Sequence, residues 1–201
     1  LFYLYLQEQN KSSVLLNALE FMRIDENGEP VMWYLQENMQ RLLNANKGVQ
    51  FIITQGFICR NPMGETDNLK RGGSDYSASL IGSATNAEEI QIWTDIDGMH
   101  NNDPRVVDNT YPVRQLSFDE AAELAYFGAK ILHPSSVNPA RAAGIPVRLK
   151  NTMDPSAAGT LISDSSAKGV IKAVAAKDNI IAVRIVSNRM LLAYGFLRNV
   201  F

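Results

Sequence analysis

The sequence has 201 residues, of which 46% are hydrophobic and 20% charged, so the chain can bury the core of a globular protein. Its formal net charge of −2, with mixed signs, favours neither a nucleic acid nor an acidic membrane as a partner. The single cysteine, Cys59, excludes an internal disulfide, and we interpret it as a small packed residue. The apolar start, Leu1 to Leu6, is too short to span a bilayer and lacks the basic start of a signal peptide, so we predict a cytoplasmic protein.

The first part of the chain predicts alternating helices and strands. Residues 1–9 are expected to form the last turns of a helix, and Ser13 to Leu16 is an apolar run typical of a buried strand. Residues 25–30 predict a turn, and the apolar spacing from Val31 to Asn44 predicts an amphipathic helix. Val49 to Thr54 predicts the next strand. Strand, helix and strand in this order favour a parallel α/β sheet.

A long excursion then separates this strand from the next helix. Phe57 to Arg60 and Glu65 to Asn68 predict two arms around the turn Asn61 to Gly64. A hairpin here would stand at the carboxyl end of the strand, where open α/β sheets bind ligands. A tolerated surface insertion is the alternative, in which Phe57 is a packed aromatic residue and not a wall of a pocket.

The stretch Lys70 to Ala78, KRGGSDYSA, is the strongest local candidate for an anion site. Its two glycines permit a close approach of the backbone, and Ser74 is expected to cap the following helix, whose amide groups and positive dipole end would face a ligand. Arg71 adds a planar guanidinium suited to a carboxylate or a phosphate. Asp75, in the first turn, also favours the helix dipole. An ordinary glycine-rich loop before a capped helix is the alternative interpretation.

The next segments continue the α/β pattern. Glu88 to Thr94 predicts a strand that enters an acidic and amide-rich loop, 95–105, which lacks the ligand spacing of a calcium loop. Ser117 and Glu120 form a capping-box pattern for a helix over 118–127, which Gly128 would end.

Farther along, His133 is interpreted as a packing residue before a short helical stretch, 134–143, and residues 145–149 return to the sheet. Two β-rich runs, 170–176 and 180–186, and a helix over 189–201 complete the prediction.

Five motifs occur in one order along the chain, and together they resemble those of the aspartate kinases, within the amino acid kinase family. They are TQGF at 54–57, RGGSDY at 71–76, WTD at 93–95, DPR at 103–105 and FGAKILHP at 127–134. The resemblance implies a three-layer α/β fold with a mainly parallel sheet between helices. It assigns residues 1–164 to the C-terminal portion of a catalytic domain and 165–201 to the start of an incomplete, ferredoxin-like ACT regulatory domain.

The resemblance also implies a reaction and the residues that perform it. The reaction is the ATP- and Mg²⁺-dependent phosphorylation of L-aspartate to 4-phospho-L-aspartate, the first step of lysine, threonine and methionine biosynthesis. Asp75 is the catalytic candidate, by orienting a catalytic cation or the glycine loop, and no cluster of protein side chains is implied to hold the metal. The binding candidates are Phe57, Arg71 and Ser74 for aspartate; Thr94, Asp95, His100, Arg105 and Lys130 for the nucleotide; and Met190, Gly195, Phe196 and Leu197 for an amino-acid effector.

Several alternatives stay open. His100 stands where many relatives have Tyr, which leaves its contact with the adenine side of the nucleotide open. Ala193 stands where some lysine-sensitive relatives have Ser, so lysine and threonine are both candidate effectors. The Lys-Phe-Gly-Gly-Thr stretch that carries the main catalytic Lys of the family does not occur in the sequence. We therefore expect an internal fragment that is inactive alone and belongs to a homo-oligomer. The other possibilities are a nucleotide-binding or regulatory half without activity, or a relative that acts on acetylglutamate, glutamate or nucleoside monophosphates.

Overall fold

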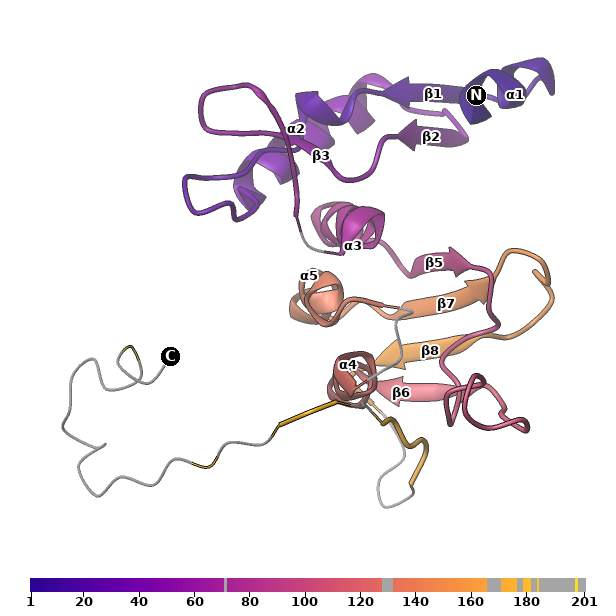
Figure 1. Ribbon diagram of the computed structural model, residues 1–201. Helices are drawn as coiled ribbons and strands as arrows, with labels where there is room; N and C mark the ends of the chain where they lie inside the picture. Colours follow the sequence, from indigo (N-terminus) through magenta and orange to yellow (C-terminus); the bar gives the residue numbers. More distant parts are fainter. Residues whose placement is uncertain are drawn as a thin grey trace.

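The computed structural model contains a small N-terminal sheet with its helices and a larger four-stranded sheet, and helix α3 lies between the two (Figure 1). The residues that the structure describes are 1–70, 72–127, 132–165, 171–176, 179–181, 184 and 198. The predicted site residues Arg71, Lys130, Met190, Gly195, Phe196 and Leu197 lie outside the described residues, as does Gly128.

The N-terminal part has the predicted order of elements. Helix α1 (Phe2–Glu8) precedes strand β1 (Ser13–Leu16), helix α2 (Met32–Ala45) follows a short 3₁₀ turn, η1 (Ala18–Glu20), and strand β2 (Phe51–Thr54) comes next. β1 and β2 pair in parallel along their whole length, as predicted for a strand-helix-strand unit. The buried face of α2 packs into a core with Phe21, Met22 and Leu80.

The excursion after β2 is a hairpin, as predicted. Strand β3 (Ile58–Arg60) pairs antiparallel with strand β4 (Thr66–Asn68). The hairpin is joined to the body of the protein, because the backbone N–H of Arg60 donates to the carbonyl of Met22 at 2.9 Å and its Nε donates to that of Leu19 at 2.9 Å. Cys59 on β3 is fully buried, and burial raises the pKa of its thiol to about 11, so the thiol stays protonated at neutral pH.

The larger sheet has the strand order β5-β7-β8-β6. Its strands are β5 (Ile90–Thr94), β6 (Gln115–Ser117), β7 (Val147–Asn151) and β8 (Thr160–Ser163). The pairs β5–β7 and β6–β8 are parallel, whereas β7 and β8 are antiparallel. The sequence analysis missed β6 and β8, because short strands of three and four residues carry little alternation.

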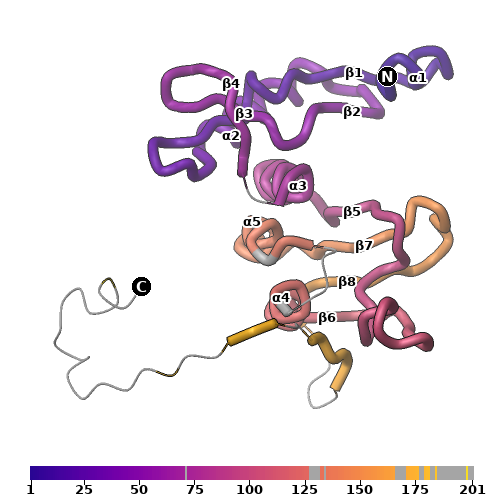
Figure 2. The backbone as a smooth tube through the Cα atoms, viewed as in Figure 1, coloured from indigo at the N-terminus to yellow at the C-terminus, as the bar shows by residue number. Residues whose placement is uncertain are grey.

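Helices cover one face of this sheet. They are α3 (Gly73–Thr85), α4 (Phe118–Phe127), the 3₁₀ turn η2 (Pro134–Val137) and α5 (Asn138–Ala142), and Figure 2 shows α3, α5 and α4 in a row beside the strands. On β5, Ile90 and Ile92 are buried beneath them, while Gln91 and Trp93 are exposed. The sequence predicted helices on both faces of the sheet. Among the described residues, this prediction is confirmed for one face.

The start of α4 agrees with its predicted capping box. The backbone N–H of Ser117 donates to Glu120 Oε2 at 2.7 Å, and the N–H of Glu120 donates to Ser117 Oγ at 3.1 Å. Because the helix begins directly at the end of β6, these two bonds fix the angle at which α4 leaves the sheet.

The predicted strands of the C-terminal part are not present in the described residues. Residues 171–176 form no strand; they run beside α4, where Lys172 forms an ion pair with Glu120. Residues 180, 181 and 184 of the second run are also outside any strand. Ile171 and Val174, the β-branched residues of the described part of this run, are 87% and 57% exposed, so packing against α4 does not account for its β-rich composition.

Two glycines offer a test of how tightly β7 and β8 are joined. Gly159 has φ +69°, and a Cβ there would collide with the carbonyl oxygen of Leu149; Gly144 has φ +68° with nothing within 4 Å of a Cβ. Both Gly→Ala substitutions incur the left-handed strain, of about 1–2 kcal/mol. Gly159→Ala should lower the free energy of unfolding by roughly 1–3 kcal/mol more than Gly144→Ala does, because backbone atoms must move to make room for the Cβ. Equal losses for the two variants in urea unfolding would contradict the described packing.

Candidate functional site

The glycine-rich loop before α3 approaches the segment that follows α4. Gly72 is the N-cap of α3 with φ +66°, and a Cβ on it would lie 2.7 Å from the Cβ of Ser136 and 3.5 Å from that of His133. The RGGSDY and LHP stretches, far apart in sequence, therefore meet in space. His133 is exposed and its Nδ1 accepts from the backbone N–H of Ser135 at 3.3 Å, so the prediction that it is a packing residue is wrong.

The predicted capping role of Ser74 is also wrong. The helix begins at Gly73, one residue before Ser74, and no side chain caps it. Since Gly72 adopts the left-handed conformation, it takes the N-cap position, and Ser74 lies exposed in the first turn. Its hydroxyl remains available at the amino end of the helix, where backbone N–H groups have no intrahelical partner.

A buried serine holds Phe57 in a strained conformation beside this helix start. Phe57 has φ +73° and is 41% exposed, and its backbone N–H donates to Ser77 Oγ at 2.7 Å. Ser77 is itself only 2% exposed. A left-handed, non-glycine residue persists only where its surroundings fix it, so Ser77 determines the position of Phe57. The sequence analysis missed Ser77, although a serine between the apolar positions of a helix was a signal for it.

Asp75, the catalytic candidate, is half-buried in the first turn of α3. Desolvation raises the pKa of its carboxyl above the ordinary value of 3.8. A carboxylate kept partly out of water interacts more strongly with a neighbouring cation or dipole than one in bulk solvent.

A large cavity opens at the carboxyl ends of the parallel strands β5 and β7. Its volume is about 840 Å³, within the range of small-molecule sites. Four predicted nucleotide residues line it, which places them together while their role stays a prediction: Thr94, Asp95, His100 and Arg105. The sequence analysis did not predict the other lining residues, Ile96, Asp97, Asn102, Asp103, Pro104, Leu124, Asn151, Val174, Ala175 and Ala176.

His100 forms hydrogen bonds on both sides of its ring. Its Nε2 lies 2.6 Å from Asp97 Oδ1 and its Nδ1 lies 2.7 Å from Thr110 Oγ1. The neutral tautomer with the proton on Nε2 satisfies both contacts, because it donates to the carboxylate and accepts from the hydroxyl. The side chain, 17% exposed, therefore joins the two arms of the loop that forms the cavity.

Arg105 shares its guanidinium with a neighbouring acid. Asp103 accepts from Nε of Arg105 at 2.9 Å and from Nη2 at 2.6 Å. These bonds lower the pKa of Asp103 to about 2 and raise that of Arg105, so both groups stay charged at neutral pH. An anion in the cavity would meet a guanidinium that is already oriented, and would share it with Asp103.

Thr160, fully buried on β8, anchors this loop to the sheet. Its Oγ1 accepts the backbone N–H of Met99 at 2.9 Å and donates to the carbonyl of Val113 at 2.6 Å. Met99 and Val113 also pair directly, through an N–H to carbonyl bond of 2.7 Å from Val113 to Met99. The Thr160 hydroxyl and this direct bond together fix both ends of the 99–113 segment, and no sequence signal had marked Thr160.

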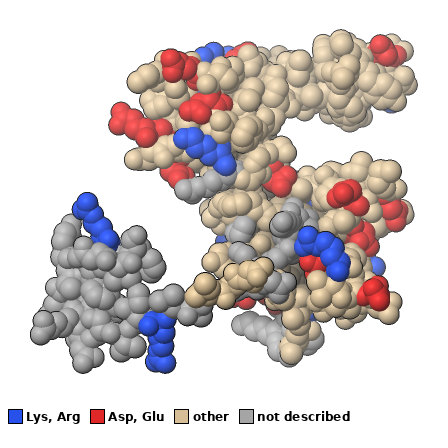
Figure 3. All heavy atoms as spheres, viewed as in Figure 1, with Lys and Arg blue, Asp and Glu red and all other residues tan. Residues whose placement is uncertain are grey.

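The described residues were also compared with the requirements of a metal site, a membrane-spanning helix and a basic surface patch. Among the described residues, no group of three or more His, Cys, Asp or Glu side chains could hold a metal ion. The same part of the chain contains no helix that is both long and apolar enough to cross a membrane. On the face in Figure 3, Lys and Arg side chains are scattered and do not form one basic patch.

Comparison with known proteins places this cavity in a known family. The sequence model of the amino acid kinase family matches residues 1–151. The chain belongs to the amino acid kinase family. The cavity lies mostly within the matched residues, but Val174, Ala175 and Ala176 come after them.

The individual relatives that match the chain are named aspartokinases. The chain is 50% identical to aspartokinase 3, chloroplastic, of Arabidopsis thaliana over 66% of its length and 24% of the relative's. It is 38% identical to lysine-sensitive aspartokinase 3 of Escherichia coli over its whole length and 46% of the relative's. The crystal structure of E. coli aspartokinase III with aspartate and ADP matches with a TM-score of 0.76 and 38% identity, over 83% of this chain and 38% of that one.

This chain thus spans between about a quarter and about half of the length of these curated relatives. The activity and substrates of the whole protein are therefore proposals here. The plant relative is named as a chloroplastic protein, so the cytoplasmic location predicted from the sequence stays a prediction.

We expect Thr160→Val to loosen the cavity loop. Valine has nearly the same shape but leaves the N–H of Met99 without its side-chain acceptor, at a cost of about 1–3 kcal/mol in unfolding free energy. Hydrogen exchange at Met99 should accelerate at the same time. Thr85→Val is the matched control, since Thr85 Oγ1 donates to the carbonyls of Ile81 at 2.9 Å and Gly82 at 3.4 Å, both within its own helix. Unchanged exchange at Met99 would contradict the anchoring role.

Asp75→Asn should stabilise the folded protein at neutral pH. Because the folded-state pKa of Asp75 lies above 3.8, the folded protein binds this proton more tightly than the unfolded chain, and stability falls as pH rises through the raised pKa. The amide lacks this charge, so its advantage should be largest at pH 7 and vanish below 3.8. Thermal unfolding at pH 7 and pH 3.5 measures the difference, with the exposed Asp108→Asn as control. A stability advantage of the Asp75→Asn variant that grows as the pH falls would contradict a raised pKa of Asp75.

Proposed function

We propose that this chain forms the nucleotide-binding part of an aspartate kinase, which phosphorylates the side-chain carboxylate of L-aspartate to 4-phospho-L-aspartate. One observation carries the proposal: a cavity of about 840 Å³ at the ends of two parallel strands gathers Thr94, Asp95, His100 and Arg105. The crystal structure of the E. coli relative, which matches most of the chain, has aspartate and ADP bound.

The chemistry requires alignment and charge neutralisation more than covalent catalysis. The acceptor carboxylate is already ionised at neutral pH, so no general base is needed. Catalysis then depends on holding the carboxylate in line with the γ-phosphate and on placing positive charge around the transferred group. In this proposal Asp75 orients a cation or the glycine-rich loop, which is consistent with its half-buried position.

In this proposal the residues that line the cavity form the nucleotide side of the site. Arg105, held by Asp103, offers its remaining N–H donors to a phosphate, and Thr94 and Asp95 stand at the end of β5. Mg²⁺ binds proteins through one or two carboxylates together with phosphate oxygens and water, so it needs no cluster of three side chains. Asp95, exposed at the cavity, is the carboxylate that fits this role, because Asp97 is bonded to His100. The metal would neutralise phosphate charge.

The aspartate side of the site is assigned by position. Phe57, held by Ser77, and Ser74 at the amino end of α3 stand beside the glycine-rich loop. Arg71, in that loop, would pair with the α-carboxylate of aspartate. The relative that covers the whole chain is named lysine-sensitive, which favours lysine over threonine as the amino-acid effector. We retain a homo-oligomer and an ACT domain at 165–201 as part of the proposal.

The test is aspartate-dependent release of ADP from Mg-ATP, measured in the full-length protein that carries this chain. Asp75→Asn should lower turnover by about 10²-fold, a typical loss for a group that supports transition-state charge. The apparent affinity for ATP should change little. Turnover with glutamate or a nucleoside monophosphate in place of aspartate would overturn the substrate assignment. Binding of Mg-ADP without turnover on any acceptor would support a nucleotide-binding protein without kinase activity.

A further inference from the structure

A wall of the nucleotide cavity comes from outside the matched family region. The family match ends at residue 151, yet Val174, Ala175 and Ala176 line the cavity together with Asp95 and Arg105. These three residues belong to the segment 171–176, which forms no strand or helix of its own. Their position therefore depends on what holds this segment to the rest of the protein.

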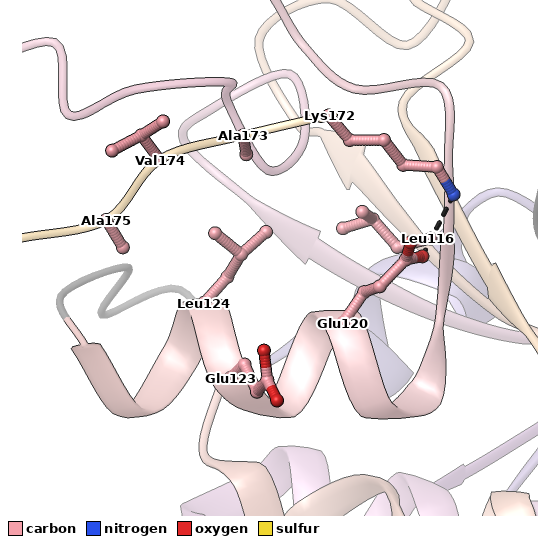
Figure 4. Close-up of a pocket in the computed structure, with 8 residues that line it drawn as sticks. All are labelled: Leu116, Glu120, Glu123, Leu124, Lys172, Ala173, Val174 and Ala175. Carbon is pink, nitrogen blue, oxygen red and sulfur yellow. Dashed lines mark hydrogen bonds and ion pairs between the residues drawn. The ribbon is translucent and has the colours of Figure 1, made fainter. Parts of the chain in front are cut away.

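Within the part of the chain that the structure describes, two polar contacts hold the segment. Lys172 Nζ lies 2.9 Å from Glu120 Oε2 on α4, and the backbone N–H of Val174 donates to the carbonyl of Asn101 at 2.9 Å. The Lys172 side chain is only 13% exposed and that of Glu120 is 36% exposed. Figure 4 shows Lys172 pointing along the helix toward Glu120, while Ala173 and Val174 run above Leu124. A partly desolvated ion pair of this kind is stronger than one in open solvent.

The anchor on α4 is itself rigid. The Glu120 oxygen that pairs with Lys172 also accepts the N–H of Ser117 at 2.7 Å, so the capping box orients the carboxylate. Leu124, one turn farther along α4, lines both the nucleotide cavity and a smaller cavity of about 410 Å³ beneath the segment. The ion pair and the cavity wall thus share one helix and are separated by a single turn.

We propose that Lys172 is a positioning residue for the nucleotide site, which closes the cavity by docking the segment 171–176 against α4. The inference rests on the proposed nucleotide binding. One ion pair and one hydrogen bond give a docking equilibrium that a single substitution can shift. Only the docked form presents the complete cavity, so the apparent dissociation constant of the nucleotide rises as the docked fraction falls. By linkage, bound nucleotide must favour docking in turn.

The segment also provides a route for regulation of that site. Anything that displaces the chain after residue 176 acts on the cavity through Val174 to Ala176, without a contact to the nucleotide itself. The predicted effector residues, Met190 and Gly195 to Leu197, come after this point in the sequence.

The experiment measures binding of Mg-ADP to the chain by titration calorimetry. Lys172→Met keeps the aliphatic stem and removes the charge, and it should weaken Mg-ADP binding by about 3- to 10-fold. Glu120→Gln retains an oxygen for the Ser117 cap while removing the ion pair, so it should have a similar effect. The double variant should lose no more than either single one, because both break the same contact. Lys172→Arg should restore most of the affinity.

Two controls separate docking from general stability. Asp119, next to Glu120 on α4, forms an exposed ion pair with Arg141, with 2.6 Å between Oδ1 and Nη1. Asp119→Asn removes this ion pair and should leave Mg-ADP binding unchanged. Mg-ADP should slow hydrogen exchange at the Val174 amide of the unsubstituted chain, an effect that a purely structural role of Lys172 does not predict. Equal affinity of the Lys172→Met variant and the unsubstituted chain overturns the inference and leaves the proposed function intact. No binding of Mg-ADP to the unsubstituted chain overturns both.

Discussion

The hydroxyl of Thr160 is the contact on which the cavity at the ends of β5 and β7 depends. The cavity is formed largely by the loop after β5, and a loop of this length needs a fixed base if its side chains are to keep their positions. Thr160 supplies that base from inside the sheet, where it is paired with Leu149 on β7. Its hydroxyl forms hydrogen bonds to both Met99 and Val113. The mixed sheet, with β8 antiparallel to β7, is what brings this residue under the loop.

Strained backbone marks the second part of the site. Phe57 and Gly72 both have positive φ values, and each lies within contact of a serine, Ser77 and Ser136 respectively. For a non-glycine residue such as Phe57 this conformation is energetically unfavourable and is kept only where neighbouring groups determine it, whereas glycine adopts it readily. Here the two conformations allow the hairpin after β2 and the loop before α3 to approach the same helix end. The raised pKa of Asp75 agrees with a residue placed for function at the expense of stability.

Local patterns in the sequence predicted much of this structure, and contacts between distant segments explain what they missed. The helical spacing of 31–44 and the capping box at Ser117 were sufficient, because their determinants are neighbours in sequence. Thr160 and Ser77 act through partners 47 and 20 residues away, so their local sequence does not identify those partners. Residues 171–176, from the strand predicted for 170–176, form no strand and run beside α4 instead. Ser74 failed as a cap because Gly72, two residues earlier, takes that position.

The most direct test of this account is to map the binding of Mg-ADP by the backbone amide chemical shifts of the isotope-labelled chain. The account predicts saturable shifts concentrated in residues 94–105, at Asn151 and in 174–176, which together surround one cavity. Residues of β1 and β2, which contribute nothing to that cavity, should keep their shifts. Saturable shifts confined to the N-terminal sheet, or no shifts at millimolar Mg-ADP, would contradict the location of the nucleotide site.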